Sequence, residues 1–531
     1  MAGRFYVNQR VSYSTSLCTI RYIGPVDGTA GEWLGVEWDE PLRGKHSGEH
    51  AGKKYFDCAV ANAGSFIRPS RAPDPPLTFV QALRKKYIDD GVVDVSAQRP
   101  IEWGGKVVQE IGFDKIRQKL RKLKELRIVL VDGLQIAKED PVELITETCP
   151  EIEDLNLSRN LFDSLQSVEV ICRALPKLRS LRISGNRFSS LHVKAEVERE
   201  DGSLGTGFDN ITSLELEETL LSWEELAKIL PLFPSLQILD LSLNRLSSIP
   251  QEIGDILITK ILTPKLTELK LERNKLTNIS SILPASLLPN LRKLLLARNQ
   301  ISSIYGPDDD PETPILFKNI RYLDLSFNSI PSFKFINAIN SHFPDVEGLR
   351  ITHNPLYEVP GMGSDEAHML TVGRLNWKVR LLNFTTITIQ ERTNAELYYL
   401  GRIAKEMAEV AEGEEEELIV RQHPRWNELC KAHGKPIVNR SLEVDRQSLG
   451  RNLINIEFVH NNQSVVRKIP KHLTVSALKG IVGILFPVRP LRVTLEILLD
   501  NANGRVLENE LKRLEVYVEE HKEVKMLVKQ A

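Results

Sequence analysis

The chain has 531 residues, 42% of them hydrophobic and 26% charged, and its formal net charge at pH 7 is −2. This length exceeds what one hydrophobic core organises, so two to four domains are expected. The near-neutral charge excludes a bulk attraction to nucleic acid, and the lack of any run of about 18 apolar residues means that no membrane span is predicted.

Cysteine usage and the first residues predict a cytosolic protein. Residues 1–8 contain no apolar stretch of the kind that a signal peptide carries, so none is expected there. The cysteines are scattered, form no CxxC pair and are odd in number, which argues against a disulfide framework. They are Cys18, Cys58, Cys149, Cys172 and Cys430. A reducing compartment fits this pattern.

Residues 1–72 are predicted to form a small, barrel-like β domain, because glycines punctuate short β-like runs. Four blocks follow in order: GEWLGVEWDEP at 31–41, GKHSG at 44–48, YFDC at 55–58 and GSFIRP at 64–69. Together they resemble the CAP-Gly family over essentially the whole domain. The family pattern in the second block is GKNDG, so His46 and Ser47 depart from it.

This resemblance implies a site for an acidic C-terminal tail that ends in an aromatic residue, notably the Glu-Glu-Tyr end of α-tubulin. The chain has the residue types for such a site. Gly44 and Gly48 permit a tight turn close to a ligand. Lys45 offers a cation to the terminal carboxylate, and backbone N–H groups around it can complete the capture. The alternative for Lys45 is a solvated loop lysine.

Aromatic and basic residues supply the rest of the expected tail site. Trp33 and Phe66 are candidates for an apolar groove, with core positions as the alternative. Arg68 is a candidate partner of a penultimate glutamate. His46 is a candidate donor to the carboxylate, which would make binding pH-sensitive. The remaining aromatics of the domain, Trp38, Tyr55 and Phe56, are expected in the core.

Residues 73–125 are predicted to be a linker and the N-terminal cap of the next domain. Prolines between 69 and 76 stiffen its start. Apolar residues at i, i+4, i+7 and i+10 from Ile116 predict a helix that reaches Leu126. The basic run 115–127 is interpreted as the outer face of that helix, with attraction to an acidic surface or a membrane as the alternative.

Residues 126–364 repeat the phrase L-x-L-x-x-N at spacings of 25 to 33 residues, which is typical of leucine-rich repeats. Each leucine pair is expected to lie inward on a short strand of an α/β solenoid, with each asparagine bonding backbone groups in a ladder through the stack. The asparagines are Asn160, Asn186, Asn244, Asn274, Asn299, Asn328 and Asn354. Leu214/Leu216 carries Thr219 instead, and Ile128/Leu130 with Gly133 is interpreted as a weaker first copy.

Residues between the core leucines are predicted to form the concave face of the solenoid. They are polar and mixed in sign, which suits a protein partner, and a merely solvated face is the alternative. The candidates are Arg182, Glu215, Glu217, Asp240, Lys270, Asp324 and Arg350.

The C-terminal part is predicted in three segments. Residues 365–412 cap the solenoid and include a helix from about 394 to 412. Residues 413–451 are an acidic hinge and linker, because four glutamates occupy 414–417. Residues 452–531 follow the order ββαβ…β, with Thr474 as a helix cap, which predicts a β-grasp, ubiquitin-like domain. No di-glycine ends it, so conjugation is not expected.

The order CAP-Gly domain, leucine-rich repeats and ubiquitin-like domain resembles the tubulin-specific chaperone E family, also called tubulin-folding cofactor E. The resemblance implies a cytoplasmic, cytoskeleton-associated, non-catalytic protein that captures α-tubulin and takes part in assembly and dissociation of the αβ-tubulin heterodimer. It also implies tubulin-folding cofactors C and D as partners. Cofactor B and, through the ubiquitin-like domain, the proteasome are further candidates.

Two other functions remain as alternatives. One is a microtubule-associated CAP-Gly adaptor with a repeat-based cargo scaffold, but the sequence has no long coiled coil or basic Ser-rich flank for such a role. The other is a ligase scaffold, which lacks the required thiol or zinc-site residues. No GxxxxGK[ST], GxSxG, HExxH or Cys/His cluster occurs, so no catalytic, cofactor or metal site is predicted.

Overall fold

The structure is a computed structural model that describes residues 5–88, 102–103, 106–107, 123–194, 197–198, 204–250, 265–438, 453–461, 463–498, 504–518 and 523–530. The chain divides into two compact units. Met1–Ile403 and Glu412–Pro436 form the first, and Ala404–Ala411 and Ile437–Ala531 form the second. Among the helices of the described residues, none has the length and apolar character that a membrane crossing needs.

The first domain is a small antiparallel β domain with the strand order β1-β2-β3-β6. A hairpin of two short strands and a 3₁₀ turn complete it. The bounds are β1 Arg10–Tyr13, β2 Ser16–Pro25, β3 Glu32–Trp38, η1 Pro41–Arg43, β4 Glu49–His50, β5 Lys53–Lys54 and β6 Gly64–Ile67. Alternate strand residues such as Ile20, Leu34 and Val36 are fully buried with Trp38 in one cluster. The predicted β fold is confirmed.

A short segment joins this domain to the repeats. Strand β7 (Leu77–Thr78) pairs in parallel with β11 (Ile136–Lys138). Helix α1 (Phe79–Tyr87) begins with a capping box in which Thr78 and Gln81 bond each other's backbone N–H groups. Strands β8 (Glu102–Trp103) and β9 (Lys106–Val107) form a hairpin. The helix predicted from Ile116 lies outside the described residues, which resume with a 3₁₀ turn at Leu123–Glu125.

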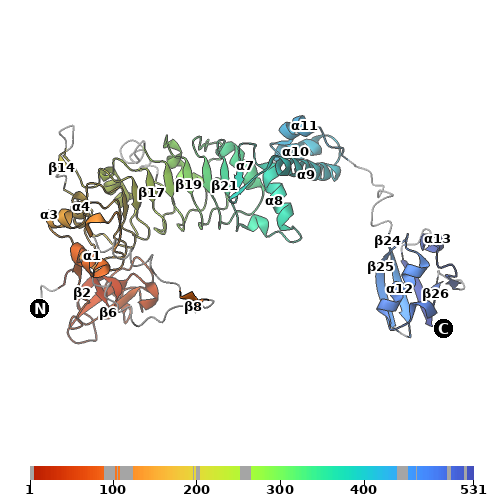
Figure 1. Ribbon diagram of the computed structural model, residues 1–531, viewed down its shortest axis with the longest axis horizontal. Helices are drawn as coiled ribbons and strands as arrows, with labels where there is room; N and C mark the ends of the chain where they lie inside the picture. Colours follow the sequence, from red (N-terminus) through yellow and green to blue (C-terminus); the bar gives the residue numbers. More distant parts are fainter. Residues whose placement is uncertain are drawn as a thin grey trace. The chain divides into compact units, whose positions relative to one another are not determined.

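The repeats form one continuous 11-stranded sheet, parallel from β10 to β22 (Figure 1). The central residue of each strand is an inward leucine or valine, and these residues pair in register from Val129 to Leu382. The strands are β10 Ile128–Leu130, β12 Asp154–Asn156, β13 Ser180–Arg182, β16 Ser213–Glu215, β17 Ile238–Asp240, β18 Glu268–Lys270, β19 Lys293–Leu295, β20 Tyr322–Asp324, β21 Gly348–Arg350, β22 Leu381–Leu382 and β23 Thr385–Thr386. The buried side chains of these repeats form one hydrophobic core, so the predicted solenoid is confirmed.

Helices lie between several of the repeat strands in the part of the chain that the structure describes. The helices are α3 Val142–Thr148, α4 Leu165–Arg173, α5 Trp223–Ile229 and α7 Lys334–His342, and a hairpin joins β14 Val197–Glu198 to β15 Leu204–Gly205. Ser164 caps α4, and Ser222 with Glu225 forms a capping box at α5. The buried faces of these helices contribute Val168, Leu226 and Ile336 to the shared core.

The first repeat differs from its predicted register by one residue. Strand β10 pairs Val129 with Leu155, so Val129 and Val131 take the inward positions and are fully buried. Ile128 and Leu130, predicted to lie inward, are 59% and 39% exposed. The prediction was wrong because side chains alternate along a strand, and a shift of one residue exchanges the two faces.

The predicted asparagine ladder is confirmed. Asn299 is representative: its Nδ2 donates to Leu271 O at 2.9 Å and Leu296 O at 3.0 Å, and its Oδ1 accepts from Leu276 N at 3.2 Å. One amide therefore joins its own repeat to the preceding one. Thr219 donates to Leu216 O at 2.9 Å, but a hydroxyl has only one hydrogen and cannot donate to two repeats at once.

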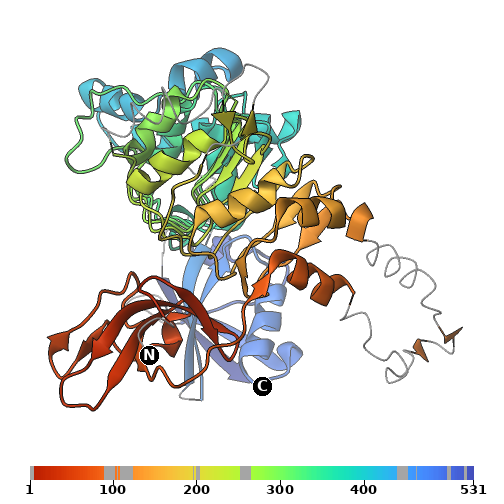
Figure 2. The ribbon, with the colours of Figure 1, turned by 90° about the vertical axis from the view of Figure 1, so that its left-hand side faces the viewer.

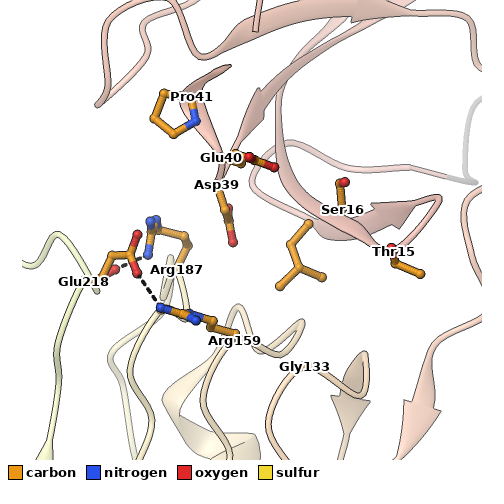
Figure 3. A pocket seen from close by; sticks show the side chains of 11 residues that line it. Thr15, Ser16, Asp39, Glu40, Pro41, Gly133, Arg159, Arg187 and Glu218 are labelled. Carbon is orange, nitrogen blue, oxygen red and sulfur yellow. Dashed lines mark hydrogen bonds and ion pairs between the residues drawn. The ribbon is translucent and has the colours of Figure 1, made fainter. Parts of the chain in front are cut away.

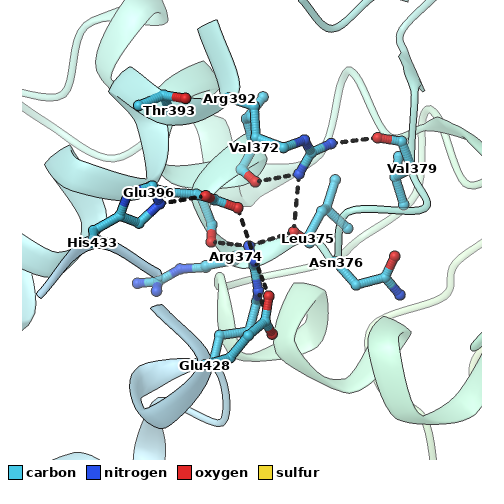
Figure 4. A network of polar contacts seen from close by, with 12 residues as sticks. Val372, Arg374, Leu375, Asn376, Val379, Arg392, Thr393, Glu396, Glu428 and His433 are labelled. Carbon is cyan, nitrogen blue, oxygen red and sulfur yellow. Dashed lines mark hydrogen bonds and ion pairs between the residues drawn. The ribbon is translucent and has the colours of Figure 1, made fainter. Parts of the chain in front are cut away.

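A helical cap closes the C-terminal end of the solenoid (Figure 1), and Figure 4 shows the network of polar contacts inside it. It contains α8 Ser364–Arg374, α9 Ile389–Ala408, α10 Glu414–Gln422 and α11 Trp426–His433. The buried Arg425 donates to Gly373 O at 2.8 Å and Leu375 O at 2.6 Å, and it pairs with Glu396 at 2.8 Å. His433 binds the other oxygen of Glu396 at 2.8 Å. This network fastens α11 to α8 and α9.

Two features of this cap differ from the sequence prediction. Helix α9 begins at Ile389, earlier than the predicted start near 394. The acidic run expected as a hinge is the first turn of helix α10, where the four glutamates lie at the positive end of the helix dipole. The predicted hinge and linker at 413–451 therefore begins with two helices, α10 and α11.

The C-terminal domain is a five-stranded sheet with the order β25-β24-β28-β26-β27. Its first and last strands pair in parallel, and the other pairs are antiparallel. The elements are β24 Leu453–His460, β25 Gln463–Pro470, α12 Val475–Leu485, β26 Val493–Leu498, β27 Arg505–Val506, α13 Glu515–Val518 and β28 Glu523–Gln530. Thr474 caps α12 by accepting from Ala477 N at 3.3 Å. This is the predicted β-grasp, ubiquitin-like fold.

The N-terminal β domain contacts the first repeats directly (Figure 2). Arg10 has a fully buried side chain and binds both Asp39 oxygens at 2.5 Å, while also reaching Asn160 O at 3.4 Å. Burial would raise the pKa of Asp39, but Arg10 outweighs it and lowers that pKa. Tyr6 donates to Asp163 at 2.5 Å, and burial, together with this hydrogen bond, raises the pKa of Tyr6 to about 12.

Candidate peptide-binding site

An aromatic cluster centred on Phe66 occupies one surface of the N-terminal domain. Five rings contact Phe66, with centroid distances between 4.9 Å for His46 and 6.4 Å for Trp33. The other three belong to His50 at 6.3 Å, Tyr55 at 5.6 Å and Phe56 at 5.6 Å. Phe66, Trp33, His46 and Tyr55 are only half-buried, and Phe56 closes the floor. Aromatic faces and edges are therefore presented together at the surface.

The glycine turn lies directly beside this cluster. A Cβ on Gly44 would lie 1.9 Å from Asn62 O, and one on Gly48 would lie 1.9 Å from Phe56 O. Gly48 also has a φ of +98°, which side-chain-bearing residues rarely adopt. Backbone bonds from Lys45 N to Gly64 O at 2.7 Å and from Gly64 N to His46 O at 2.8 Å tie the turn to β6. The turn therefore has a fixed shape.

His46 has a defined hydrogen-bonding role in this turn. Its Nδ1 accepts from Gly48 N at 3.0 Å. The neutral ring therefore carries its hydrogen on Nε2, which leaves one donor for a ligand. Partial burial lowers the pKa of His46, with smaller contributions from His50 and Lys45, while Glu49 opposes them. The neutral ring thus predominates near pH 7.

Cationic side chains surround the cluster. Lys45, Lys53 and Lys54 are exposed, and the two last are paired with Asp27 and Asp57. Among the ion pairs of the described residues, none involves Lys45, so its ammonium group is available to an anionic ligand.

Arg68, predicted as the partner of a penultimate glutamate, packs against the aromatic cluster. Its guanidinium lies 3.7 Å from the Trp33 ring centroid and donates to Ala30 O and Glu32 O. Trp33 Nε1 in turn donates to Thr29 Oγ1 at 2.8 Å. Arg68 therefore covers one face of the Trp33 ring while keeping its charge at the surface, since the side chain remains exposed.

The structure thus brings together, at one surface, predicted site residues from separate parts of the domain. They are Trp33, Gly44, Lys45, His46, Gly48 and Phe66. Sequence reasoning missed two members of the cluster. It placed Tyr55 in the core, but Tyr55 is half-buried and accepts from Asp27 N at 2.8 Å. It did not consider His50, whose position depends on the short β4–β5 hairpin. The adjacent pair Tyr55-Phe56 was the available signal, since neighbours on an extended segment face opposite sides.

The predicted concave residues lie on one face of the repeat sheet, and most of their charges pair with each other. Arg182 binds Asp154 at 2.7 Å and Glu215 at 3.4 Å. Lys270 binds Asp240 at 3.4 Å. Further along, Arg350 binds Asp324 at 3.1 Å and lies 4.8 Å from the ring of Phe384. These pairs run across neighbouring strands, where opposite charges stabilise the sheet modestly.

Acidic residues are in excess at the centre of this strand face. Burial raises the pKa of Glu215, Glu217 and Glu272, and the carboxylate of Asp240 raises each of them further. Lys270 lowers the pKa of these carboxyls without cancelling the effect. The strand face is therefore largely neutralised within itself and carries a small acidic centre.

A cleft of about 430 Å³ lies between the N-terminal domain and the repeats (Figure 3). Thr15, Asp39 and Glu40 line one side, and residues of the repeat turns line the other. Arg187 donates to Glu218 O, and Arg159 pairs with the Glu218 carboxylate at 3.4 Å. Because Asp39, Arg159 and Glu218 are already ion-paired, this cleft forms part of the interface between the domains.

Known proteins share these features. The family model of the CAP-Gly domain matches residues 7–72, and that of the Leucine Rich Repeat matches residues 235–256. Tubulin-specific chaperone E of Bos taurus is 30% identical over 529 residues, covering 96% of this chain and 96% of the relative. Tubulin-specific chaperone E of Xenopus laevis is 29% identical over 521 residues, with the same coverage.

Among solved structures, the C-terminal ubiquitin-like domain of mouse tubulin-specific chaperone e is similar to this chain. It is 22% identical, the match covers 16% of this chain and 94% of that domain, and the TM-score is 0.15.

A CAP-Gly domain that carries a surface aromatic cluster and contacts a leucine-rich repeat stack defines a multidomain protein of the CAP-Gly, leucine-rich repeat class. The similarity to the Bos taurus relative extends over nearly all of both chains. The chain belongs to the tubulin-specific chaperone E family.

Proposed function

We propose that this protein is a non-catalytic tubulin-folding chaperone that captures α-tubulin by its acidic-aromatic C-terminal tail. It would take part in assembly and dissociation of the αβ-tubulin heterodimer. Membership of the family supports the tubulin substrate, and the Phe66 cluster supports the mode of capture. The observation that carries this proposal is the combination of half-buried rings with the exposed Lys45, whose ammonium group forms no ion pair among the described residues.

Tail capture uses each group of the site in a distinct role. The terminal ring would lie among Trp33, Tyr55 and Phe66, where edge-to-face contacts are favourable. The terminal carboxylate would accept from Lys45 and from His46 Nε2. Arg68, held over Trp33, would face the penultimate glutamate. The glycine turn keeps these donors in place before the ligand arrives, which reduces the ordering cost of binding.

The remaining domains would act on the body of the same partner. A tail held by the CAP-Gly domain raises the effective concentration of the tubulin body near the repeat sheet. The chaperone would then shift the heterodimer equilibrium by its differential affinity for free α-tubulin. Tubulin-folding cofactors C and D, and also B, would join this cytoplasmic, cytoskeleton-associated cycle. The ubiquitin-like domain would contact a further partner such as the proteasome.

Binding to α-tubulin with and without its terminal tyrosine tests the capture site. We expect tighter binding of the tyrosinated form by roughly tenfold, because the ring contributes about 1.4 kcal/mol or more. Lys45→Ala should weaken binding of both forms by a similar factor. The exposed Lys85→Ala is the matched control and should behave as the wild type. If the wild type and Lys45→Ala bind both forms of α-tubulin equally well, the site has no part in the mechanism.

Mixing the protein with αβ-tubulin separates a chaperone from a microtubule adaptor. A chaperone should deplete the heterodimer and leave a complex with α-tubulin that size-exclusion chromatography resolves. An adaptor should instead sediment with intact microtubules and leave the heterodimer unchanged.

A further inference from the structure

A row of equivalent turn residues runs along one rim of the solenoid. The residue before each ladder asparagine has a positive φ, between 51° for Arg159 and 69° for Gly185. Its N–H bonds the next repeat, as in the bonds from Arg273 to Ala297 O and from Arg298 to Ser326 O. In chain order the row is Gly133, Arg159, Gly185, Glu218, Leu243, Arg273, Arg298, Phe327 and His353.

The first part of this row faces the CAP-Gly domain. Gly133, Arg159, Gly185 and Glu218 all line the cleft opposite Asp39. Immediately beyond them, Arg245 follows the ladder residue Asn244 and donates to Ala59 O at 2.6 Å. The CAP-Gly domain thus reaches the rim as far as this repeat, and the rim continues past it without a break.

The part of the rim beyond the CAP-Gly domain is basic. We define the basic rim as Arg245, Arg273, Lys275 and Arg298, all of which are exposed. Among the described residues, no acidic side chain forms an ion pair with any of them. The cations of the strand face differ, since Arg182, Lys270 and Arg350 each bind a carboxylate. The positive charge of the basic rim is therefore free to attract an external anion.

A stack of three side chains orders the far end of the basic rim. The Arg298 guanidinium lies 4.1 Å from the Phe327 ring centroid, and the His353 ring stacks on Phe327 at 4.0 Å with an angle of 12°. Held in this way, Arg298 loses less conformational freedom when it binds an anion than a free surface arginine would.

We propose that the basic rim binds the acidic stretch that precedes the terminal aromatic residue of the captured tail. This inference rests on the proposed function, since it assumes that the tail end lies at the Phe66 cluster. Neighbouring repeats lie about 4.8 Å apart and an extended peptide rises about 3.3 Å per residue, so the basic rim from Arg245 to Arg298 spans roughly three residues. An acidic segment of that length would meet a cation at each repeat.

Peptide length provides the test. One peptide would carry the last three residues of the α-tubulin tail, Glu-Glu-Tyr, and a longer one would carry additional glutamates before them. The full-length protein should bind the longer peptide about tenfold more tightly at low salt, because each exposed ion pair adds a small factor. This advantage should shrink as salt rises, since the charges are exposed.

The variant Arg273→Asn/Lys275→Gln/Arg298→Asn removes three rim charges. Asparagine suits the positive φ at 273 and 298, so the turns should remain intact. The variant should bind the short peptide as tightly as the wild type does. It should bind the longer peptide no more tightly than the short one. Lys228→Ala/Lys318→Ala/Lys334→Ala removes the same charge from exposed positions away from the rim and should keep the advantage.

The outcomes separate the two proposals. If the rim variant keeps the preference for the longer peptide, or if the control variant loses it equally, the basic rim is not the binding surface. If the wild-type protein binds neither peptide, the capture site itself has failed. Binding of the short peptide with no gain for the longer one overturns the rim proposal alone.

Discussion

A single ladder residue holds three backbone groups of the solenoid. Replacing Asn299 with alanine leaves the carbonyl of Leu271 and the N–H of Leu276 without their partner, whereas Leu296 O keeps its bond from Asn328 Nδ2 at 3.0 Å. Buried groups left unsatisfied cost about 1–3 kcal/mol each, and partial relaxation limits the sum, so we expect a loss of roughly 3 kcal/mol in the free energy of unfolding. Urea unfolding of the solenoid, followed by far-UV circular dichroism, measures it.

The neighbouring Gln300 provides the control for this substitution. Its side chain is exposed, so Gln300→Ala should change the unfolding free energy by less than about 0.5 kcal/mol. If the two variants unfold at the same urea concentration, the ladder does not contribute to stability as its geometry indicates.

His46 predicts a pH dependence of the glycine turn. Its pKa is lowered in the folded protein, so the unfolded chain binds a proton first as the pH falls. The stability contribution is therefore complete above the ordinary histidine pKa of about 6.5 and declines as the pH falls below it. Protonation also removes the acceptor for Gly48 N. Hydrogen exchange within residues 44–66, corrected for intrinsic rates, should accelerate between pH 7 and pH 5.

His46→Asn is the matched variant for this prediction, because an amide oxygen can accept from Gly48 N and does not titrate. Exchange in the variant should lose most of its pH dependence over the same range. A pH dependence equal to that of the wild type would show that another group is responsible.

At the scale of elements, Arg425 determines how helix α11 is held. Its guanidinium donates to Gly373 O in α8 and to Leu375 O directly after that helix. It also pairs with the carboxylate of Glu396 on α9. Burial would raise the pKa of Glu396, but the bonds from His433 and Arg425 lower it overall. Arg425→Ala leaves that carboxylate partly buried and without its main partner, which costs on the order of 3 kcal/mol. Hydrogen exchange should rise throughout α11.

A nearby surface arginine gives the comparison for that substitution. Arg421 on α10 is exposed and pairs with Glu417 at 3.7 Å, a contact of little energetic value. Arg421→Ala should leave exchange in α11 unchanged. Equal acceleration in both variants would place the effect in the whole cap rather than in the buried network.

The order of elements in the solenoid was predictable because each repeat contains the residues that determine its own strand and turn. Leucines must face inward in pairs, and each asparagine must satisfy a turn, so the pattern identified both without tertiary information. The first repeat was harder, because Ile128, Val129, Leu130 and Val131 are all apolar and do not reveal which alternate set is buried. The pairing of β10 with β12 decides it.

The backbone of the candidate site was predictable because a sequence motif determines it. Side-chain positions that depend on tertiary contacts were less predictable. GKHSG identified the turn, and Trp33 and Phe66 identified the surface. The stacking of Arg68 on Trp33 could not be predicted, because it depends on the pairing of β3 with β6. The basic rim could not be predicted either, since only the structure shows which cations already have carboxylate partners.

The CAP-Gly domain and the repeats contact each other within one unit, so we expect the proposed tail capture and the proposed binding of the tubulin body to be interdependent. A domain on a flexible tether samples many positions, whereas a docked domain presents the tail at one place beside the repeats. The docking contacts on the repeat side include Asp163, which accepts from Tyr6, and Arg187, which is attracted by Asp39. Neither residue belongs to the Phe66 cluster.

The variant Asp163→Ala/Arg187→Ala should therefore uncouple two affinities. Binding of an isolated tail peptide should remain within about twofold of the wild type, because the Phe66 cluster is untouched. Binding of whole α-tubulin should weaken by roughly tenfold or more, since the second contact no longer follows the first at high effective concentration. Asp163→Asn keeps an acceptor for Tyr6 and should retain the wild-type ratio. Calorimetry gives both constants, and an unchanged ratio in the double variant would show that docking does not couple the sites.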